Sequence, residues 1–191
     1  MSSHQHNSLE SEDSDYGPKL NLDSNMLRQL VSSHLNRNCV STRRLSRGHN
    51  NEIHLLQLDN GPDCIARLHA IQAKLASKVA TMKYIAQNTR IKVPEVYDWD
   101  CRTHNIIKTP YVLMERLPGK HLYWVWDELT VENKKSVLGQ IIKILFEIWM
   151  KCRFKEIGCL YMKNDSLDPI QERASYLRRF VPFHGVFNAH Q

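Results

Sequence analysis

The sequence predicts an α+β fold, in which an antiparallel sheet of about five strands carries one packed helix and is followed by further helices. Three observations support this prediction. Asn60-Gly61 lies between two extended segments, which is a strong signal for a β-hairpin. Apolar residues then recur at helical spacing over residues 75–86. A longer amphipathic pattern covers residues 131–154 and predicts a second long helix.

The remaining elements follow in chain order. Asp23 or Ser24 caps a first helix, because short polar side chains accept hydrogen bonds from the free amides of a helix start. Two extended segments, 52–58 and 63–69, form the hairpin, and two more, 95–99 and 111–116, follow the middle helix. The first helix packs through apolar residues at helical spacing, namely Met26, Leu27, Leu30, Val31 and Leu35.

Composition limits the classes of partner. The net charge is +6, but the basic residues cluster weakly, most densely at Arg43, Arg44 and Arg47, and aromatic residues are not interleaved with them. A solvated basic face therefore explains the charge better than a nucleic-acid partner. The ten histidines do not follow an H-E-x-x-H spacing, and the five cysteines do not form a C-x-x-C pair, so a metal site is not expected.

The compartment is also suggested by composition. An odd number of scattered cysteines favours a reducing environment. The first residues lack an apolar core and are acidic, and the most apolar stretch, 137–150, is interrupted by Gln140, Lys143 and Glu147. We therefore expect a soluble protein without a membrane span, located in the cytoplasm.

Several segments together resemble a known family. They are LSRGHNNEIHLLQLDNG, IARLH, ASKVATMKYIAQNTRIKVPEVYDWD, TPYVLMERLPGKHLYWVW and FKEIGCLY, within residues 45–161. Their order and spacing resemble fungal members of the aminoglycoside phosphotransferase and choline kinase-like family. The resemblance implies a protein kinase-like small lobe over residues 23–119 and a partial helical large lobe over 120–191. A disordered, acidic and Ser-rich tail is expected over residues 1–22.

The resemblance also implies a nucleotide site. Gly48, His49, Asn50 and Asn51 match the family's nucleotide loop, where a glycine lets backbone amides approach phosphate closely. Arg67 matches the third-strand cation that contacts the α- and β-phosphates. The cofactor implied is ATP or GTP with Mg²⁺, and the implied activity is phosphorylation of a small-molecule hydroxyl.

The connector after the fourth extended segment resembles the family's hinge between lobes. Backbone groups near Glu115 and Leu117 would hydrogen-bond an adenine, and Met114 would pack behind the ring. An edge strand that ends at a Pro-Gly turn explains the same residues. Trp124 and Trp126 follow, and they either anchor the connector or stack on a ligand.

One position departs from the family pattern within this half. The family carries a glutamate on the helix after the third strand, where it pairs with the strand's cation. Lys78 matches that position here, and a lysine beside Arg67 would repel it. The alternative is that Lys78 extends its charge outward into solvent.

The catalytic half of the family pattern is not found. The sequence has no His-x-Asp motif, and Val186 stands where the terminal HGVFN segment would need its aspartate. Three interpretations stay open: a truncated and inactive phosphotransferase, a pseudokinase-type module that binds a nucleotide or a protein partner through its exposed large-lobe face, or a fragment of an incomplete gene model. We therefore name neither catalytic nor metal-binding residues; the acids that follow Tyr161 are Asp165, Asp168 and Glu172.

Overall fold

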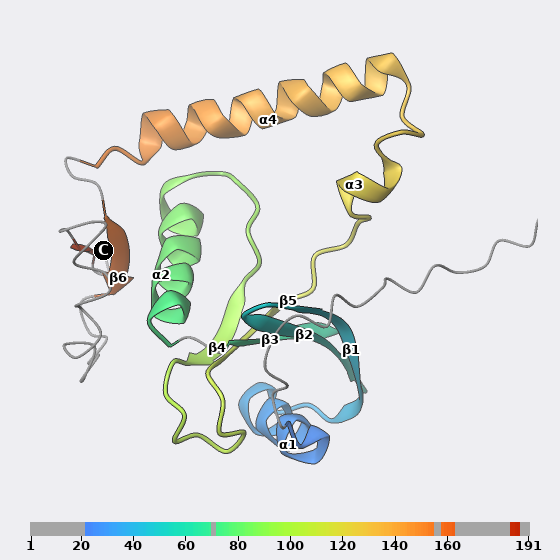
Figure 1. Cartoon of the computed structure of the whole chain (residues 1–191), viewed down its shortest axis with the longest axis vertical. Helices are drawn as coiled ribbons and strands as arrows, with labels where there is room; N and C mark the ends of the chain where they lie inside the picture. The colour runs from blue at the N-terminus through green and yellow to red at the C-terminus, as the bar shows by residue number, and fades with distance from the viewer. Residues whose placement is uncertain (1–21, 70–71, 155–157, 163–183, 188–191) are drawn as a thin grey trace, which may run out of the picture.

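The computed structural model describes residues 22–69, 72–154, 158–162 and 184–187, and the α+β fold predicted from the sequence is confirmed (Figure 1). An antiparallel five-stranded sheet forms the centre, in the order β1-β2-β3-β5-β4. The elements are α1 (Ser24–Leu35), β1 (Cys39–Gly48), β2 (Asn51–Leu58), β3 (Cys64–His69), α2 (Gln72–Asn88), β4 (Val96–Asp100), β5 (Tyr111–Glu115), α3 (Leu122–Val125), α4 (Val131–Lys151), β6 (Cys159–Met162) and β7 (His184–Phe187).

The predicted helices and hairpin are found close to their expected bounds. Asp23 caps α1, since its carboxylate accepts a 2.8 Å hydrogen bond from the amide of Asn25. Gly61, in the turn between β2 and β3, has a φ of 74°, a left-handed conformation that favours glycine. Helix α2 ends at Asn88, two residues beyond the periodic stretch 75–86.

Strand β1 is the sheet element that the sequence left unlocated. Its residues do not alternate between apolar and polar, and only Cys39 and Arg47 are buried. Two irregularities in its pairing with β2, between Cys39 and Ser41 and between Arg44 and Ser46, disturb the period further. An edge strand of this kind is formed by pairing with its neighbour, so local patterning does not reveal it.

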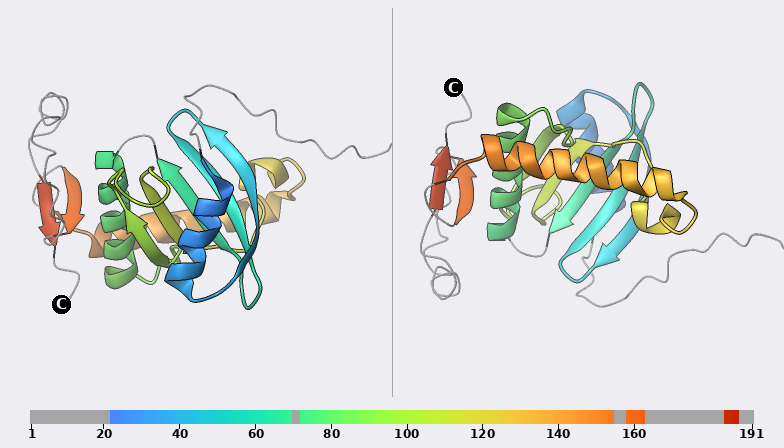
Figure 2. Two further views of the ribbon diagram at one scale, coloured as in Figure 1. Left: turned by 90° about the horizontal axis from the view of Figure 1, so that it is seen from below. Right: turned by 90° about the horizontal axis from the view of Figure 1, so that it is seen from above.

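The first core lies between α1 and the sheet. It combines the inward side chains of β2, β3 and β5 with the buried stripe of α1, on the face shown toward the viewer at the left of Figure 2. Cys64, Ala66 and Leu68 alternate along β3 toward this face, and all three are fully buried. A polar contact also joins α1 to β4: Nε2 of His34 lies 3.2 Å from a carboxylate oxygen of Asp98.

The second core lies on the opposite face, under α2. Leu75 and Val79 of α2 pack against Val112 of β5, and partly buried side chains of β4, β5 and β6 surround them. Because successive residues of a strand point to opposite faces, Val112 faces α2 while its neighbour Leu113 faces α1. The sheet is therefore covered by a helix on each face.

The segment after β5 has fewer buried side chains than the sheet and the two helices that cover it. Helix α4 lies apart from the sheet, on the side opposite α1 (Figures 1 and 2), and none of its side chains is buried. The backbone amide of Arg90 donates a 2.6 Å hydrogen bond to the carboxylate of Glu147 in α4. Just after α4, the ring of Phe154 lies 5.2 Å from that of Tyr84. The region after residue 120 also contains two strands, β6 and β7, which pair in parallel, so the expectation of helices alone was incomplete. Strands of four residues are too short to establish a period.

Several expectations fall outside the described residues. They concern the tail at residues 1–21 and the acids Asp165, Asp168 and Glu172. Within the described part of the chain, the cysteines are free, and none of the helices is both long and apolar enough to cross a membrane.

Replacing Leu68 by alanine tests the first core. Leu68 is fully buried in the central strand, and such substitutions cost about 2–5 kcal/mol of unfolding free energy, since they leave a cavity. The control is Val40→Ala in β1, where the side chain is 52% exposed and a change within about 0.5 kcal/mol is expected. Both are measured by denaturant unfolding. Equal losses for the two variants would contradict the burial described for β3.

Candidate functional site

The predicted nucleotide loop is the tip of the β1–β2 hairpin. Gly48 and Asn51 are paired across the two strands, and His49 and Asn50 form the turn between them. A Cβ added at Gly48 would meet no atom within 4 Å, and Gly48 does not have a positive φ. The hairpin itself does not require a glycine here, and the space beside this residue is open to a ligand.

An ion pair joins the two strands at the base of this hairpin. The Nε atom of Arg47 lies 3.5 Å from Oε1 of Glu52, and Nε2 of His54 lies 3.3 Å from Oε2 of the same carboxylate. All three residues are buried, and burial lowers the pKa of His54 while its hydrogen bond to Glu52 opposes that effect. Sequence reasoning missed this cluster, although Arg47 and Glu52 flank the turn and are paired in register.

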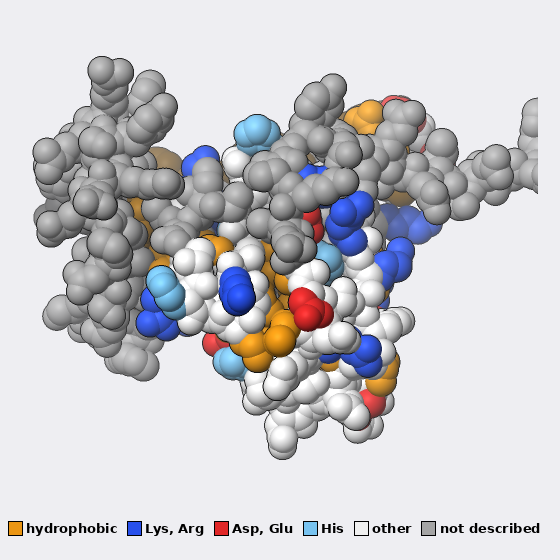
Figure 3. All heavy atoms as spheres, turned by 60° about the horizontal axis from the view of Figure 1, so that its bottom comes forward, with side chains coloured by type: hydrophobic (Ala, Val, Ile, Leu, Met, Phe, Trp, Pro, Cys, Tyr) orange, Lys and Arg blue, Asp and Glu red, His pale blue; other side chains and the backbone are white. Residues whose placement is uncertain are grey.

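Arg43, Arg44 and Arg47 form the densest basic group in the sequence, and the burial of Arg47 changes how that group is interpreted. Arg43 and Arg44 are exposed in β1, but Arg47 is only 5% exposed. Viewed from the α1 side, Lys and Arg side chains gather toward the β1 edge of the molecule (Figure 3). The exposed part of the predicted basic group is therefore smaller than the sequence indicated.

Arg67 lies in the centre of the sheet, on the face opposite α1. It pairs with Ile53 of β2 and Val112 of β5, and its neighbour Leu68 points into the first core. The Nε atom of Arg67 is buried and has no hydrogen-bond partner in the structure. A buried donor without a partner costs about 1–3 kcal/mol, so this geometry favours a ligand that supplies an acceptor.

Two further polar side chains, those of His69 and Asn51, lie on the same face, next to Arg67 along the strands. His69 is directly opposite Asn51 in the β2–β3 pairing, and His69 follows Arg67 by two residues, so its side chain shares the Arg67 face. Nε2 of His69 and Oδ1 of Asn51 are also buried without hydrogen-bond partners. Sequence reasoning named Asn51 but missed His69, which the two-residue spacing from Arg67 would have indicated.

Helix α2 brings Lys78 to this group. Lys78 is partly buried, and burial, followed by the charges of Arg67 and Lys74, lowers the pKa of Lys78 below its ordinary value. Burial, together with the charges of Lys78 and Arg67, lowers the pKa of His69 to about 3. We call Arg67, His69, Lys74 and Lys78 the Arg67 cluster. The sequence-based expectation that Lys78 faces Arg67 without a carboxylate between them describes this arrangement better than the outward alternative.

The connector residues lie at the other end of β5. The amide of Glu115 already donates a 2.8 Å hydrogen bond to the carbonyl of Glu95, so it is not available to a base. The carboxylate of Glu115 binds Nζ of Lys92 at 2.7 and 2.9 Å, and this hydrogen bond lowers the pKa of Glu115. Met114 packs in the second core, and Leu117, 37% exposed, follows in the connector.

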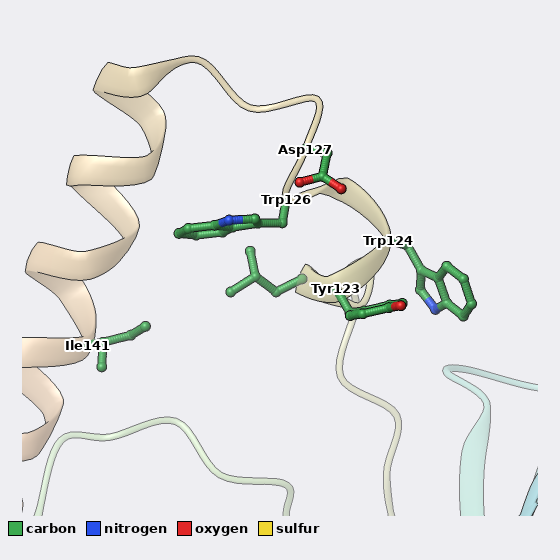
Figure 4. A pocket seen from close by; sticks show the side chains of 6 residues that line it. Tyr123, Trp124, Trp126, Asp127 and Ile141 are labelled. Carbon is green, nitrogen blue, oxygen red and sulfur yellow. The ribbon is translucent and has the colours of Figure 1, made fainter.

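The two tryptophans of the connector have different surroundings. Leu122, Trp126 and Ile141 line an open hollow of about 600 Å³ between α3 and α4, in which the Trp126 ring points toward α4 (Figure 4). Trp124 is 63% exposed and points away from α4. Lys134 lies 5.6 Å from the Trp126 ring centre, a cation–π contact. Trp126 thus contributes to the packing of α3 against α4.

The buried, neutral His69 makes stability depend on pH. The folded-state pKa is about 3 and the ordinary value is 6.5, so the unfolded state binds the proton more readily. The contribution of His69 is therefore present above about pH 6.5 and is lost as the pH falls toward 3, by up to about 1.4 kcal/mol per unit. Denaturant unfolding between pH 7 and 5 measures this slope, which His69→Gln should reduce.

A variant of Lys78 provides a second test of the buried His69 site. Lys78→Met removes one of the two charges that depress the pKa of His69, so the imidazole should protonate at a higher pH than in the wild type. The measurement is an NMR titration of the His69 ring protons. A wild-type His69 that titrates near 6.5 would contradict the buried site described above.

Comparison with known proteins adds relatives of two kinds. A subtelomeric hrmA-associated cluster protein of Aspergillus fumigatus is 33% identical over 132 residues, which are 66% of this chain and 26% of that protein. Altered inheritance of mitochondria protein 9, mitochondrial, of Candida tropicalis is 28% identical over 148 residues, which are 71% of this chain and 24% of that protein. The chain thus spans about a quarter of the length of these relatives.

Among solved structures, the streptomycin–ATP ternary complex of APH(2″)-IIa aligns with 84% of this chain and 58% of its own, with 14% identity and a TM-score of 0.40. The expected cytoplasmic location is contradicted, because the relatives from Candida tropicalis and Zygosaccharomyces rouxii are named as mitochondrial. Targeting signals are read by receptors, so the charge of a tail does not determine location.

The family match covers the site. It extends over residues 41–149, from β1 into α4, and includes the hairpin tip, Arg67, Lys78 and the connector. This is more than half of the 191 residues. The chain belongs to the phosphotransferase enzyme family.

Proposed function

We propose that this chain binds a purine nucleoside triphosphate, ATP or GTP, on the sheet face that carries the Arg67 cluster. The observation that carries this proposal is the set of buried polar atoms without partners, on Arg67, His69 and Asn51, beside the charge of Lys78. Phosphate oxygens are strong acceptors and carry the opposite charge, so a phosphate suits Nε of Arg67 and the ammonium group of Lys78 better than water does. Oδ1 of Asn51 is itself an acceptor and takes no hydrogen bond from phosphate oxygens.

The spacing along β5 suits an extended nucleotide. Val112 pairs with Arg67, and Glu115 is three residues further, which is about 10 Å at the usual rise of a strand. We propose that the phosphates lie at Arg67 and the hairpin tip of residues 48–51, and that the base lies at the connector. The amide of Glu115 is occupied, so the contact with the base falls to the backbone of Leu117, which makes no hydrogen bond within the described chain, with Met114 behind the ring.

We further propose that these 191 residues bind the nucleotide without transferring its phosphate, as a pseudokinase does. They lack the His-x-Asp motif whose aspartate accepts the proton of the attacking hydroxyl. In this proposal residues 23–119 form the nucleotide-binding lobe and residues 120–191 part of a second lobe, in a mitochondrial protein like the named relatives. Sequencing the transcript beyond the codon of Gln191 tests the alternative, in which a longer product carries the catalytic carboxylates and phosphorylates a small-molecule hydroxyl.

Titration calorimetry of the full chain with ATP tests the binding site, once with Mg²⁺ and once with EDTA. Arg67→Ala removes a charged hydrogen-bond donor to phosphate, so affinity should fall by about tenfold or more. The control is Arg43→Ala, an exposed residue of β1, which should leave affinity unchanged. An absence of binding heat under both conditions, with the protein folded, would refute the nucleotide proposal.

A second candidate function is protein interaction, and the surface of α4 favours it. Five of its apolar side chains are 60–65% exposed: Val131, Ile142, Leu145, Phe146 and Trp149. Exposed apolar side chains that gather on one helix in this way are characteristic of an interface. In a solution of the purified chain, the apolar surface available to cover it is that of a second copy.

Sedimentation velocity at increasing concentration tests this second function. The wild-type chain should self-associate, and Leu145→Gln with Trp149→Gln should shift it toward monomer, because less apolar area is then removed from water. The matched control is Lys143→Gln, an exposed polar residue of the same helix, which should behave as the wild type. A wild-type chain that stays monomeric at high concentration would contradict the prediction.

A further inference from the structure

The chemistry of the Arg67 cluster differs from that of a site that holds a nucleotide through a metal ion. In phosphotransferases of this fold, Mg²⁺ bridges the phosphates and is itself held by carboxylates. The Arg67 cluster offers two cationic side chains on one face of the sheet. Arg67 pairs with Val112, on which Leu75 and Val79 of α2 pack, and the partly buried Lys78 precedes Val79 on that helix. The charge of Arg67 accordingly contributes to lowering the pKa of Lys78. The next residue on the face, His69, is a neutral imidazole at physiological pH.

The carboxylates of the described sheet strands already have partners. Helix α2, β1 and β3 contain no acidic residue, and Glu52 of β2 points to the opposite face of the sheet, where it pairs with Arg47. The four acidic residues of the sheet strands all have partners: Glu52 with Arg47 and His54, Asp98 with Tyr111 and His34, Asp100 with Arg102, and Glu115 with Lys92. Neither Arg67 nor Lys78 forms an ion pair in the described part of the chain.

The donor set that the described residues place on this face therefore does not fit Mg²⁺. This ion takes oxygen ligands in an octahedral geometry and is bound in proteins through one or two carboxylates. Among the described residues, no group of three His, Cys, Asp or Glu side chains could hold a metal ion. Two positive side chains would also repel a divalent cation brought in with the phosphates.

We propose that this site holds the polyphosphate of its nucleotide directly between Arg67 and Lys78, and that it prefers the metal-free anion to the Mg²⁺ complex. This inference rests on the nucleotide-binding function proposed above. Lys78 replaces the glutamate that would neutralise Arg67, so both cations are free to face phosphate oxygens. At this position the family has a carboxylate that orients Arg67, whereas this chain has a second cation, which neutralises charge on the ligand.

The preference has a physical origin in charge. Mg²⁺ cancels two negative charges of the triphosphate, and these are the charges that Arg67 and Lys78 would otherwise meet. In a partly buried site a charge pair is several times stronger than in water. We therefore expect ATP with EDTA to bind at least about tenfold more tightly than ATP with excess Mg²⁺. Tripolyphosphate without metal should compete with ATP, because the cations contact its phosphates alone.

The experiment compares the dissociation constants of ATP for the full chain, measured by titration calorimetry at one ionic strength, with EDTA and with excess MgCl₂. Lys78→Met should abolish the preference by weakening the metal-free complex. Lys78→Glu should reverse it, since a carboxylate would pair with Arg67 and tolerate Mg²⁺. Lys83→Met, on the same helix but absent from the groups that shift the pKa of Lys78, is the matched control and should keep the preference.

The possible outcomes separate the two proposals. Tighter metal-free binding that depends on Lys78 supports the inference. Equal or tighter binding of the Mg²⁺ complex by the wild type overturns the inference, while the nucleotide site itself stands. A chain that binds neither form refutes the nucleotide function as well. Circular dichroism verifies that each variant is folded, and the wild-type comparison decides the question even if a variant fails to fold.

Discussion

The alternation of side chains along β3 is the constraint on which both faces of this structure depend. Cys64, Ala66 and Leu68 point into the core beneath α1, so Arg67 and His69 must point to the other face. A shift of one residue in the pairing with β2 and β5 would place Arg67 under α1 and move Leu68 to the α2 face. The apolar core therefore fixes the position of the candidate site, and the stability of the core and the geometry of the site cannot be varied independently.

The candidate site contains several unfavourable interactions close together. Elsewhere in the described sheet the carboxylates have partners, as at the hairpin base, where Arg47 and Glu52 are buried together. At the Arg67 cluster, like charges face each other, and buried polar atoms lack partners. Functional sites commonly carry such local strain, because a ligand relieves it on binding. A phosphate group has the charge and the acceptors that would do so.

The two parts of the described chain differ in how they are stabilised. The sheet has a core on each face, whereas α4 has no buried side chain. Its contacts with the sheet region include the hydrogen bond from the backbone amide of Arg90 to the side chain of Glu147, and the segment just after it adds the ring contact of Phe154 with Tyr84. A helix with this apolar surface gains stability mainly through packing, because helix propensity alone is weak in water. The sheet region is thus the part whose stability is accounted for by its own contacts.

Local patterns in the sequence were sufficient for the helices, for the hairpin at Gly61 and for the identification of Arg67 and the connector, since these depend on nearby residues and on a family pattern. They were not sufficient for β1, which lacks an apolar alternation and is formed by pairing with β2. Nor did they reveal that Arg47 is buried with Glu52, or that His69 and Asn51 lie opposite each other beside Arg67. Burial and cross-strand neighbours arise from residues far apart in the chain. The sequence by itself determined which side chains were available, and only the tertiary structure decided which charges would meet, because register and packing bring distant residues together.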